Sequence, residues 1–270
     1  RALTHSPRVK RDTRQKIQNI ANNLGYHPNG LARSIRLQHT HTLGVIIPDI
    51  LNAFFTKLSR AIEDAADKAG YDVVLVNTDE SLAKEANALS LLLEKQVDGI
   101  IITSAGGPTK YTDILGNTPA VFVDRMPPVT GQLAYDRVLV DNIQGTRAVV
   151  TELIHQGAQR IGIINSAVSF TATERMTGYR EALTQAGFEP DAAIEATART
   201  DNSNVQQMTR QLLVNQKCDG LFVADNTIME EVLRKLPALD LPPIHLGGFD
   251  DQDWFDFSPQ PIVTARQPIA

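Results

Sequence analysis

Polar and aromatic side chains follow directly after several short apolar runs of this sequence. They supply carboxylates, amides, a hydroxyl, a guanidinium and aromatic rings, at Asp49, Asn52, Phe54, Phe55, Ser104, Asp124, Arg125, Asp141, Asn142, Asp225, Asn226, Asp250 and Asp251. Such groups are typical of sites for polyhydroxylated ligands, because every hydroxyl needs a paired donor and acceptor. Each residue alone has a simpler role, since Asp and Asn often cap helices and Phe54 and Phe55 suit a core. Only their convergence at one place favours a binding site.

Motifs for catalysis are missing from the sequence. There is no G-x-G-x-x-G after the first apolar run, no G-x-x-x-x-G-K-[ST], no G-x-S-x-G and no H-E-x-x-H. Cys218 precedes an apolar run, where a small buried hydrophobe is better placed than a nucleophile. His155 and His245 have no neighbours typical of metal ligands. We therefore expect a binding protein with no enzyme activity, metal or cofactor.

The elements that would position these side chains are short strands alternating with helices. The apolar runs lie at residues 43–47, 73–76, 99–102, 120–123, 161–164, 220–223 and 244–246. Runs without polar alternation suit parallel strands covered on both faces. Helical spacing is found between them, at 55–69, 82–95, 145–156, 173–186, 205–216 and 229–236. The alternation predicts an α/β fold of doubly wound parallel sheets.

The two halves of this region echo each other. Leu43-Gly44-Val45-Ile46-Ile47 is matched by Ile161-Gly162-Ile163-Ile164, and Val97-Asp98-Gly99-Ile100 is matched by Cys218-Asp219-Gly220-Leu221. The offsets, 118 residues between Gly44 and Gly162 and 121 between Gly99 and Gly220, are nearly equal. They predict two similar α/β lobes that meet near Asp141-Asn142. Ligands collect beyond the carboxyl ends of parallel strands, so we expect a cleft between the lobes.

The net charge of −5 hides two segments of opposite sign. Residues 1–42 carry eight Lys or Arg against Asp12 alone, or +7, whereas the other residues carry 18 basic and 30 acidic side chains, or −12. A basic arm on an acidic body is typical of an appendage that binds a polyanion. A solvated charged helix or a purification scar would give the same charge.

Helix signals also divide the arm. Asp12-Thr13-Arg14-Gln15 is typical of a helix start, and Gly25 before Tyr26-His27-Pro28 is typical of a stop. A second amphipathic stretch at 29–37 is too short to be stable alone, so we expect it to fold on a partner. Residues 38–42 are expected to form a linker.

Length and composition place the chain among ordinary globular proteins. Its 270 residues favour two domains, and 42% hydrophobic with 21% charged residues argue against disorder and coiled coil. No apolar run approaches the ~18 residues of a membrane span, and Arg1-Ala2-Leu3-Thr4-His5 lacks the apolar centre of a signal peptide. One cysteine, Cys218, cannot form an internal disulfide. We expect a cytoplasmic protein that does not contact membranes.

Several motifs, taken in order, resemble the LacI family of bacterial transcription repressors over essentially the whole chain. They are Arg1-Ala2-Leu3, Ser6-Pro7-Arg8-Val9, Thr13-Arg14-Gln15-Lys16-Ile17, Leu24-Gly25-Tyr26-His27-Pro28-Asn29, Leu31-Ala32-Arg33-Ser34, Gly44-Val45-Ile46-Ile47-Pro48-Asp49, Val97-Asp98-Gly99-Ile100, Val123-Asp124-Arg125, Arg175-Met176-Thr177-Gly178-Tyr179-Arg180, Gly248-Phe249-Asp250-Asp251 and Arg266-Gln267-Pro268. The resemblance implies a helix-turn-helix headpiece, a hinge helix in the DNA minor groove, and a two-lobed core similar to periplasmic sugar-binding proteins.

The resemblance also implies site residues. Effector contacts correspond to Asp49, Asn52, Phe55, Asp124, Arg175, Asp225, Asp250 and Gln267. DNA contacts correspond to Arg1, Thr4, Arg8, Lys10, Thr13, Asn29, Ala32, Arg33 and Ile35. Ile35 stands where the family usually places a wedging leucine, and Asp225-Asn226 departs from the commoner Ser-Asp or Asn-Asp order.

The same resemblance implies a division of the chain. Residues 1–25 correspond to a remnant of the headpiece, 26–42 to the hinge helix and linker, 43–141 to the N-terminal lobe, 142–265 to the C-terminal lobe, and 266–270 to the start of a return to the N-terminal lobe. We expect about the first twenty headpiece residues and the last helices to be absent from this chain.

The expected function is a sequence-specific DNA-binding repressor, a homodimer on operator DNA. Its effector would be a sugar, a sugar phosphate or a sugar acid held between the lobes, and either release or promotion of DNA binding fits the residues. The alternative is a sugar-binding solute receptor for a transporter, which shares the core fold. The basic arm and the missing export signal oppose that alternative.

Overall fold

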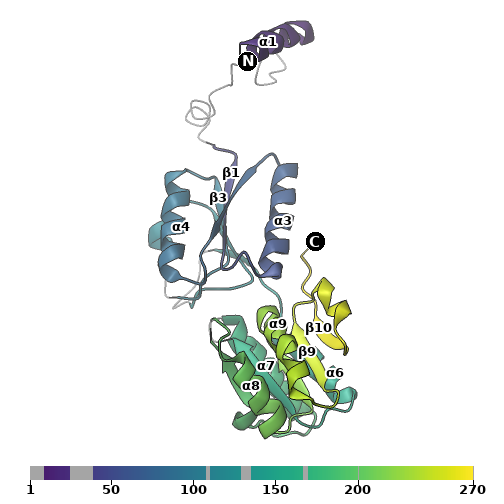
Figure 1. Ribbon diagram of the computed structural model, residues 1–270. Coiled ribbons are helices and arrows are strands. Elements are labelled where there is room, and N and C mark those ends of the chain that lie inside the picture. The colour runs from purple at the N-terminus through teal and green to yellow at the C-terminus, as the bar shows by residue number, and fades with distance from the viewer. Residues whose placement is uncertain are drawn as a thin grey trace.

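The computed structural model describes residues 9–24, 39–107, 110–128, 135–166, 170–199 and 201–269. A helix of the basic arm, α1 (Arg11–Asn23), precedes two lobes that follow one another along the molecule (Figure 1). The helix predicted between Asp12 and Gly25 is thereby confirmed. The second stretch predicted in the arm, at 29–37, lies outside the described residues.

Lobe 1 is built on a five-stranded parallel sheet in the order β2-β1-β3-β4-β5. Its strands are β1 (Thr42–Ile47), β2 (Asp72–Asn77), β3 (Gly99–Ile102), β4 (Ala120–Val123) and β5 (Asp136–Val138). The helices of this lobe are α3 (Ala53–Lys68), α4 (Leu82–Glu94) and the short α5 (Tyr111–Leu115). Helices α3 and α4 cover opposite faces of the sheet (Figure 1).

Lobe 2 repeats this plan with a second parallel sheet, in the order β10-β9-β8-β6-β7. Its strands are β6 (Ile161–Ser166), β7 (Glu195–Ala198), β8 (Gly220–Val223), β9 (His245–Phe249) and β10 (Ile262–Ala265). Its helices are α6 (Asn142–His155), α7 (Phe170–Gln185), α8 (Val205–Arg210) and α9 (Asn226–Lys235). Shorter turns are η1 (Ala192–Ile194), the π-helical η2 (Gln211–Asn215), η3 (Leu236–Leu239) and η4 (Asp253–Phe257).

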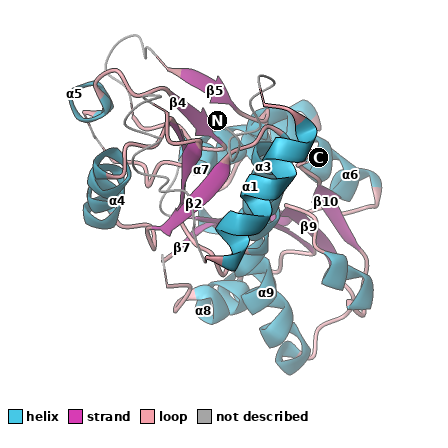
Figure 2. Cartoon of the chain, turned by 90° about the horizontal axis from the view of Figure 1, so that it is seen from above, coloured by secondary structure: helices cyan, strands magenta, loops and turns pink. Residues whose placement is uncertain are grey.

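The predicted α/β fold with two doubly wound parallel sheets is confirmed. All seven apolar runs contain strand residues, and most of their side chains are buried because helices cover both faces of each sheet, as Figure 2 also shows. The run at 73–76 is only partly buried, because β2 lies at the edge of its sheet. The helices begin and end where local chemistry requires. Asn52 caps α3 and Ser81 caps α4. The predicted stops at Gly70, Gly157 and Gly187 all have the positive φ that glycine adopts without strain.

Three strands and the five-residue helix α5 lack a signal in the sequence. Strands β5, β7 and β10 are at most four residues long and lie at sheet edges, and β5 is exposed throughout. Edge strands of this kind show no apolar run, because only one side of the strand is paired and little of it is buried. The helix predicted at 205–216 is real, but its last turn is the π-helical η2. No helix in the described part of the chain is long and apolar enough to cross a membrane.

Candidate functional site

Two aspartates occupy equivalent places at the junction of the lobes. Asp124 leaves β4 and Asp250 leaves β9, which are corresponding strands of the two sheets. Both have left-handed backbones, with φ of 65° and 72°, and both are 6% exposed. The amide of Asp124 donates to the Val138 carbonyl, and that of Asp250 donates to the Ala265 carbonyl, each at 3.0 Å. Left-handed residues other than glycine are strained, and such strain is concentrated at functional sites.

A buried arginine neutralises the lobe 1 aspartate. Nε of Arg125 lies 3.4 Å from Oδ2 of Asp124, and Nη1 of Arg125 donates to both carboxylate oxygens of Glu80 at 2.8 and 2.9 Å. The guanidinium lies over the Phe55 ring, 5.3 Å from its centroid. Burial raises the pKa of Asp124 and of Glu80, although Arg125 opposes the shift in both cases.

The lobe 2 arginine has neutral partners instead. Arg175 on α7 donates from Nε to Oδ1 of Asn142 at 3.0 Å and from Nη1 to the Ala224 carbonyl at 2.6 Å. Its guanidinium lies 3.8 Å from the centroid of the Phe249 ring. Asn142 is itself held, because its Nδ2 donates to Glu174 at 2.9 Å. Arg175 is 6% exposed, so its position is fixed by these contacts.

The residues after Arg175 explain why it lies where it does. A Cβ on Gly178 would come within 2.4 Å of the Ile143 carbonyl, so only glycine allows α7 to approach α6 this closely. Tyr179 is fully buried and donates its hydroxyl to the Ile161 carbonyl at 2.7 Å, which ties α7 to β6. The Arg-x-x-Gly-Tyr frame is therefore a packing device that fixes the helix bearing Arg175.

Gln267 joins the C-terminal segment to the site. Its Nε2 donates to Oδ1 of Asp250 at 2.5 Å. Burial raises the pKa of Asp250 to about 6, against the opposing charge of Arg175 and this hydrogen bond. Ile269, two residues later, packs against the lobe 1 cluster that contains Phe54 and Phe55. The segment after β10 thus contacts both lobes.

A buried hydrogen bond crosses directly from lobe to lobe. Oδ1 of Asn52 accepts from Phe54 N at 3.0 Å, which caps α3, and also from Nδ2 of Asn226 on α9 at 2.9 Å. Both amides are buried. Asp225 caps α9 by accepting from Thr227 N at 2.8 Å, and Asp49 accepts from Leu51 N at 2.9 Å.

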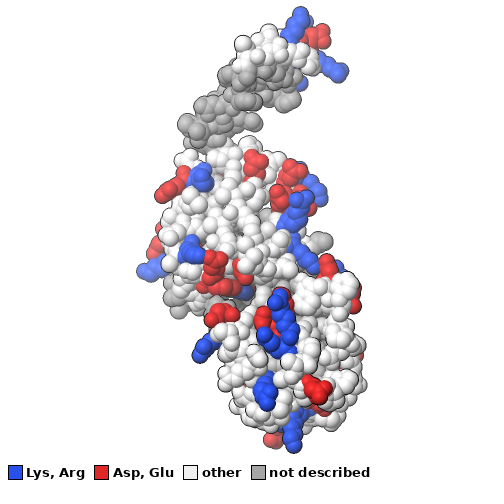
Figure 3. Space-filling model, in the orientation of Figure 1, with Lys and Arg blue, Asp and Glu red and all other residues white. Residues whose placement is uncertain are grey.

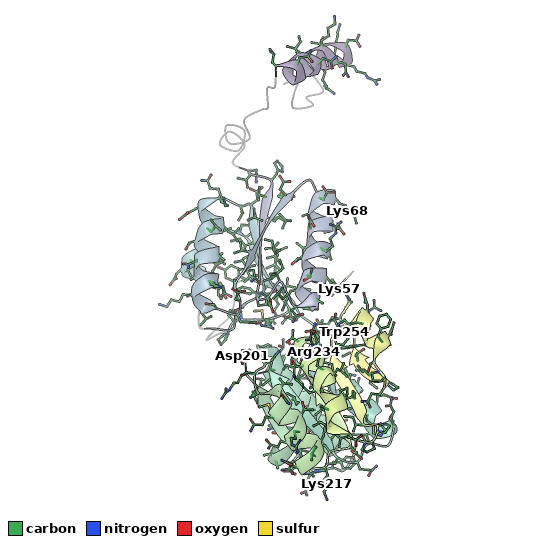
Figure 4. The ribbon with its side chains drawn as sticks, viewed as in Figure 1. Lys57, Lys68, Asp201, Lys217, Arg234 and Trp254 are labelled. Carbon is green, nitrogen blue, oxygen red and sulfur yellow. The ribbon has the colours of Figure 1, made fainter. Side chains whose placement is uncertain are left out.

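A cavity of about 70 Å³ lies at this crossing point. Its lining combines acidic, basic and amide side chains from both lobes: Asp49, Asn52, Glu80, Arg125, Ser166, Arg199, Asn202, Asp225, Thr227 and Ile228. A second cavity, of about 270 Å³, is lined by residues that include Phe54, Lys57, Asp250 and Gln267. Lys57 of α3 also forms a 3.0 Å ion pair with Asp253 of lobe 2, and Figure 4 places it at the junction.

The predicted site residues therefore fall into two groups and one exception. Asp124, Arg175, Asp250 and Gln267 form the buried centre, and Asp49, Asn52 and Asp225 line the small cavity. Phe55 is the exception, because it is 2% exposed and packs in the lobe 1 core, with Arg125 over its ring. Ser104 is also buried, and its hydroxyl is paired with Tyr111 at 2.9 Å.

Three residues of the site were not among the predicted effector contacts. Arg125 and Asn226 each come directly after a predicted effector contact, Asp124 and Asp225, so their place in the sequence indicates them equally well. Glu80 lies in the turn after β2, and only its tertiary pairing with Arg125 brings it to the site. Asn142 has a supporting role through Arg175, and its neighbour Asp141 caps α6.

The arm is described only in part. Lys10 and Thr13 are exposed at the start of α1, whose basic side chains are visible in Figure 3. The other predicted DNA contacts, Arg1, Thr4, Arg8, Asn29, Ala32, Arg33 and Ile35, lie outside the described residues. No group of three or more potential metal ligands occurs in the described part of the chain.

Comparison with known proteins decides the family. Residues 40–226, more than half of the chain, match the family model for periplasmic binding proteins and the sugar-binding domain of the LacI family. The chain belongs to the LacI family. The ribose operon repressor of Halalkalibacterium halodurans is 31% identical over 279 residues, which cover 100% of this chain and 80% of the repressor. This relative is a transcriptional repressor, and the chain spans 80% of its length.

Solved LacI-family structures share the fold. The Lac repressor dimer bound to operator and the anti-inducer ONPF has a TM-score of 0.84 at 23% identity, with 100% of this chain and 82% of that chain covered. The Cra transcriptional dual regulator of Pseudomonas putida, solved with fructose 1-phosphate, has a TM-score of 0.76 at 22% identity, with 86% and 87% covered.

Proposed function

We propose that this protein is a sequence-specific DNA-binding repressor whose effector, a sugar or sugar derivative, binds between the two lobes. The observation that supports this most directly is the meeting of Arg175, Asp124 and Asp250 at the junction, with polar groups from both lobes around them. Carboxylates and guanidinium groups in a buried setting discriminate strongly among ligand hydroxyls. The family's sugar-binding domain covers this part of the chain.

The junction also suggests how the effector would act. The Asn52–Asn226 hydrogen bond joins the lobes beside the small cavity, so we propose that a sugar bound there replaces this hydrogen bond or parts the lobes. An effector that binds one lobe arrangement better than the other shifts the equilibrium between them. We propose that this shift changes the spacing of the DNA-binding arms.

Operator DNA is the proposed partner of the arm. Residues 1–42 carry a net charge of +7, and Lys10 and Thr13 expose their side chains at the start of α1. Positive charge of this density supports phosphate contacts, which make binding salt-dependent. We propose DNA contacts at the residues named in the sequence analysis, and domain limits of 1–25, 26–42, 43–141, 142–265 and 266–270. A cytoplasmic location follows from a DNA-binding role.

We also propose a homodimer, which would match a palindromic operator. An apolar groove of about 990 Å³ on lobe 2 is lined by five prolines, by Leu241 and by Trp254, and Phe257 on the same turn is 87% exposed. Exposed apolar side chains gathered in one groove support the proposal that this face is an interface. The Lac repressor of the same fold was solved as a dimer on its operator. Phe257→Ser should weaken self-association in sedimentation equilibrium at least tenfold, whereas Phe170→Ser, at an exposed phenylalanine of α7, should leave it unchanged.

A mobility-shift experiment tests the main proposal. The full-length protein is used to select duplexes from a random DNA pool, and retention is then measured against salt and against added sugars. Sequence-selective, salt-sensitive retention that a sugar changes would support the repressor. Absence of retention at low salt, with sugar binding intact, would instead support the solute receptor.

A further inference from the structure

Both buried arginines of the junction already have partners. Nη1 of Arg125 donates to both oxygens of Glu80, and its Nε faces Asp124 in an ion pair. Arg175 donates hydrogen bonds to Asn142 and to the Ala224 carbonyl, and its guanidinium lies over the Phe249 ring. A phosphate or carboxylate ligand would have to displace these contacts before it could use either guanidinium, at the cost of unpairing buried groups.

Buried polar atoms near the junction that lack a hydrogen-bond partner favour a ligand that can donate hydrogen bonds. Among the described residues near the junction, Oδ1 of Asp124 and Oδ1 of Asn226 are buried without a hydrogen-bond partner. The two residues are 6% and 4% exposed. Both atoms are acceptors and need a donor. A hydroxyl can donate and accept, whereas an ionised phosphate or carboxylate only accepts.

The charge of the junction also opposes an anion. Asp49, Glu80, Asp124, Asp225 and Asp250 face it from both lobes, and Asp251 and Asp253 lie at the second cavity. The cations are Arg125, Arg175 and the exposed Arg199, with Lys57 and Arg266 at the second cavity, so seven carboxylates face five cations. An adjoining cavity is lined by Asp49, Asp201, Glu230 and Glu231 with Lys235 as its one cation. Acidic side chains are visible beside the junction on both lobes in Figure 3, and Figure 4 marks Asp201 there.

The raised pKa values of the buried carboxyl groups agree with this excess of negative charge. Burial raises the pKa of Glu80, Asp124 and Asp250, and neighbouring carboxylates raise each of them further. A further anion, and above all a dianionic phosphate, would add repulsion where the dielectric constant is low.

Resting on the proposed function, we infer that the effector is an uncharged polyhydroxylated sugar, and that phosphorylated and acidic sugars are excluded. Its hydroxyls donate to Oδ1 of Asp124 and to Oδ1 of Asn226. The Glu80–Arg125 ion pair is the specificity element, because it prevents Arg125 from capturing an anion. The fold alone does not decide this, since the Cra regulator was solved with fructose 1-phosphate.

Calorimetric titration of the full-length protein against matched sugars tests the inference. The panel contains pentoses, hexoses and disaccharides, the corresponding sugar phosphates, and uronic acids. We expect a neutral sugar to bind, and its phosphate and its acid to bind at least 100-fold more weakly. Tighter binding of a phosphate or an acid would overturn the inference and leave the sugar-responsive repressor standing. Binding of no panel member would overturn both.

Releasing Arg125 provides a second test. Glu80→Gln keeps the size of the side chain but removes the charge that occupies Arg125, so affinity for sugar phosphates should rise at least tenfold. Glu63→Gln, which removes an exposed carboxylate of α3 paired with Arg60, is the matched control and should leave the panel unchanged. Circular dichroism confirms that both variants are folded. Unchanged phosphate affinity in folded Glu80→Gln would refute the proposed role of the ion pair.

Discussion

The two lobes share one plan, and in each lobe an aspartate clamps the chain that enters the first strand, but the two aspartates clamp segments of different origin. Asp98 accepts from the amides of Thr40 and His41, at 2.8 and 3.1 Å, as the chain enters β1. Asp219 accepts from the amides of Gln159 and Arg160, at 2.9 and 2.7 Å, as the chain enters β6. In lobe 2 the clamped chain comes from α6 of the same lobe. In lobe 1 it comes from the basic arm, so the same clamp fixes the connection between arm and core.

The buried arginines differ in a similar way. Arg125 in lobe 1 is neutralised within hydrogen-bonding distance by Glu80, whereas Arg175 in lobe 2 is held by an amide, a carbonyl and an aromatic ring. The charge of Arg175 therefore acts on Asp250 and Asp124 through space. We therefore propose that lobe 1 supplies selectivity through its closed ion pair and that lobe 2 supplies a rigidly placed charge. Variants that affect one lobe at a time can separate these roles.

The largest loss of stability is expected from the support of the lobe 2 arginine. Gly178→Ala places a Cβ 2.4 Å from the Ile143 carbonyl, so α7 must move away from α6, and the free energy of unfolding should fall by about 3 kcal/mol. Urea denaturation measures the change. Gly187→Ala, at a positive φ with open space around it, should cost only about 1 kcal/mol. Equal losses would show that the close approach of the two helices does not matter.

A smaller effect is expected from the protonation of Asp250. The folded protein raises the pKa of this carboxyl to about 6 from an ordinary value of 3.8, so it binds the proton more tightly than the unfolded chain does. The resulting stability is fully present below about pH 4 and is lost as the pH rises through about 6, and on the order of 2 kcal/mol of this loss falls between pH 4 and pH 7. Asp250→Asn should remove this part of the pH dependence in denaturation curves collected between pH 4 and 7. An unaltered slope would contradict the assignment.

The smallest effect on stability, and the sharpest contrast between the lobes, concerns the two clamps. Asp98→Ala and Asp219→Ala should each cost about 1 kcal/mol, because each leaves backbone amides without an acceptor. Only Asp98→Ala should also weaken the effect of sugar on operator binding, since only that clamp holds the chain leading to the arm. Anisotropy titrations of labelled operator with and without sugar provide the comparison. Equal coupling in both variants would mean that the two clamps have the same role.

The fold can be predicted from the sequence because strands that are covered on both faces form apolar runs. The internal repeat also indicates two lobes, and the clamping aspartates Asp98 and Asp219 belong to its second pair of motifs, 121 residues apart. The short edge strands were not readable, since strands such as Asp136–Val138 bury almost nothing. Aspartates at strand ends were found by position alone. Their partners were missed where the pairing is tertiary, as for Glu80 with Arg125, 45 residues apart, and Asn226 with Asn52, 174 residues apart.

The most direct test of the account is the response of operator-bound protein to sugar when Arg175 is removed. In wild-type full-length protein, a saturating neutral sugar should change operator affinity at least tenfold. Arg175→Ala should bind operator within about twofold of wild type and show no response at 100-fold higher sugar, because the charge that fixes Asp124 and Asp250 is gone. Arg180→Ala, an exposed arginine of the same helix, should respond normally. A normal response in Arg175→Ala would contradict the assignment of the effector site to this junction.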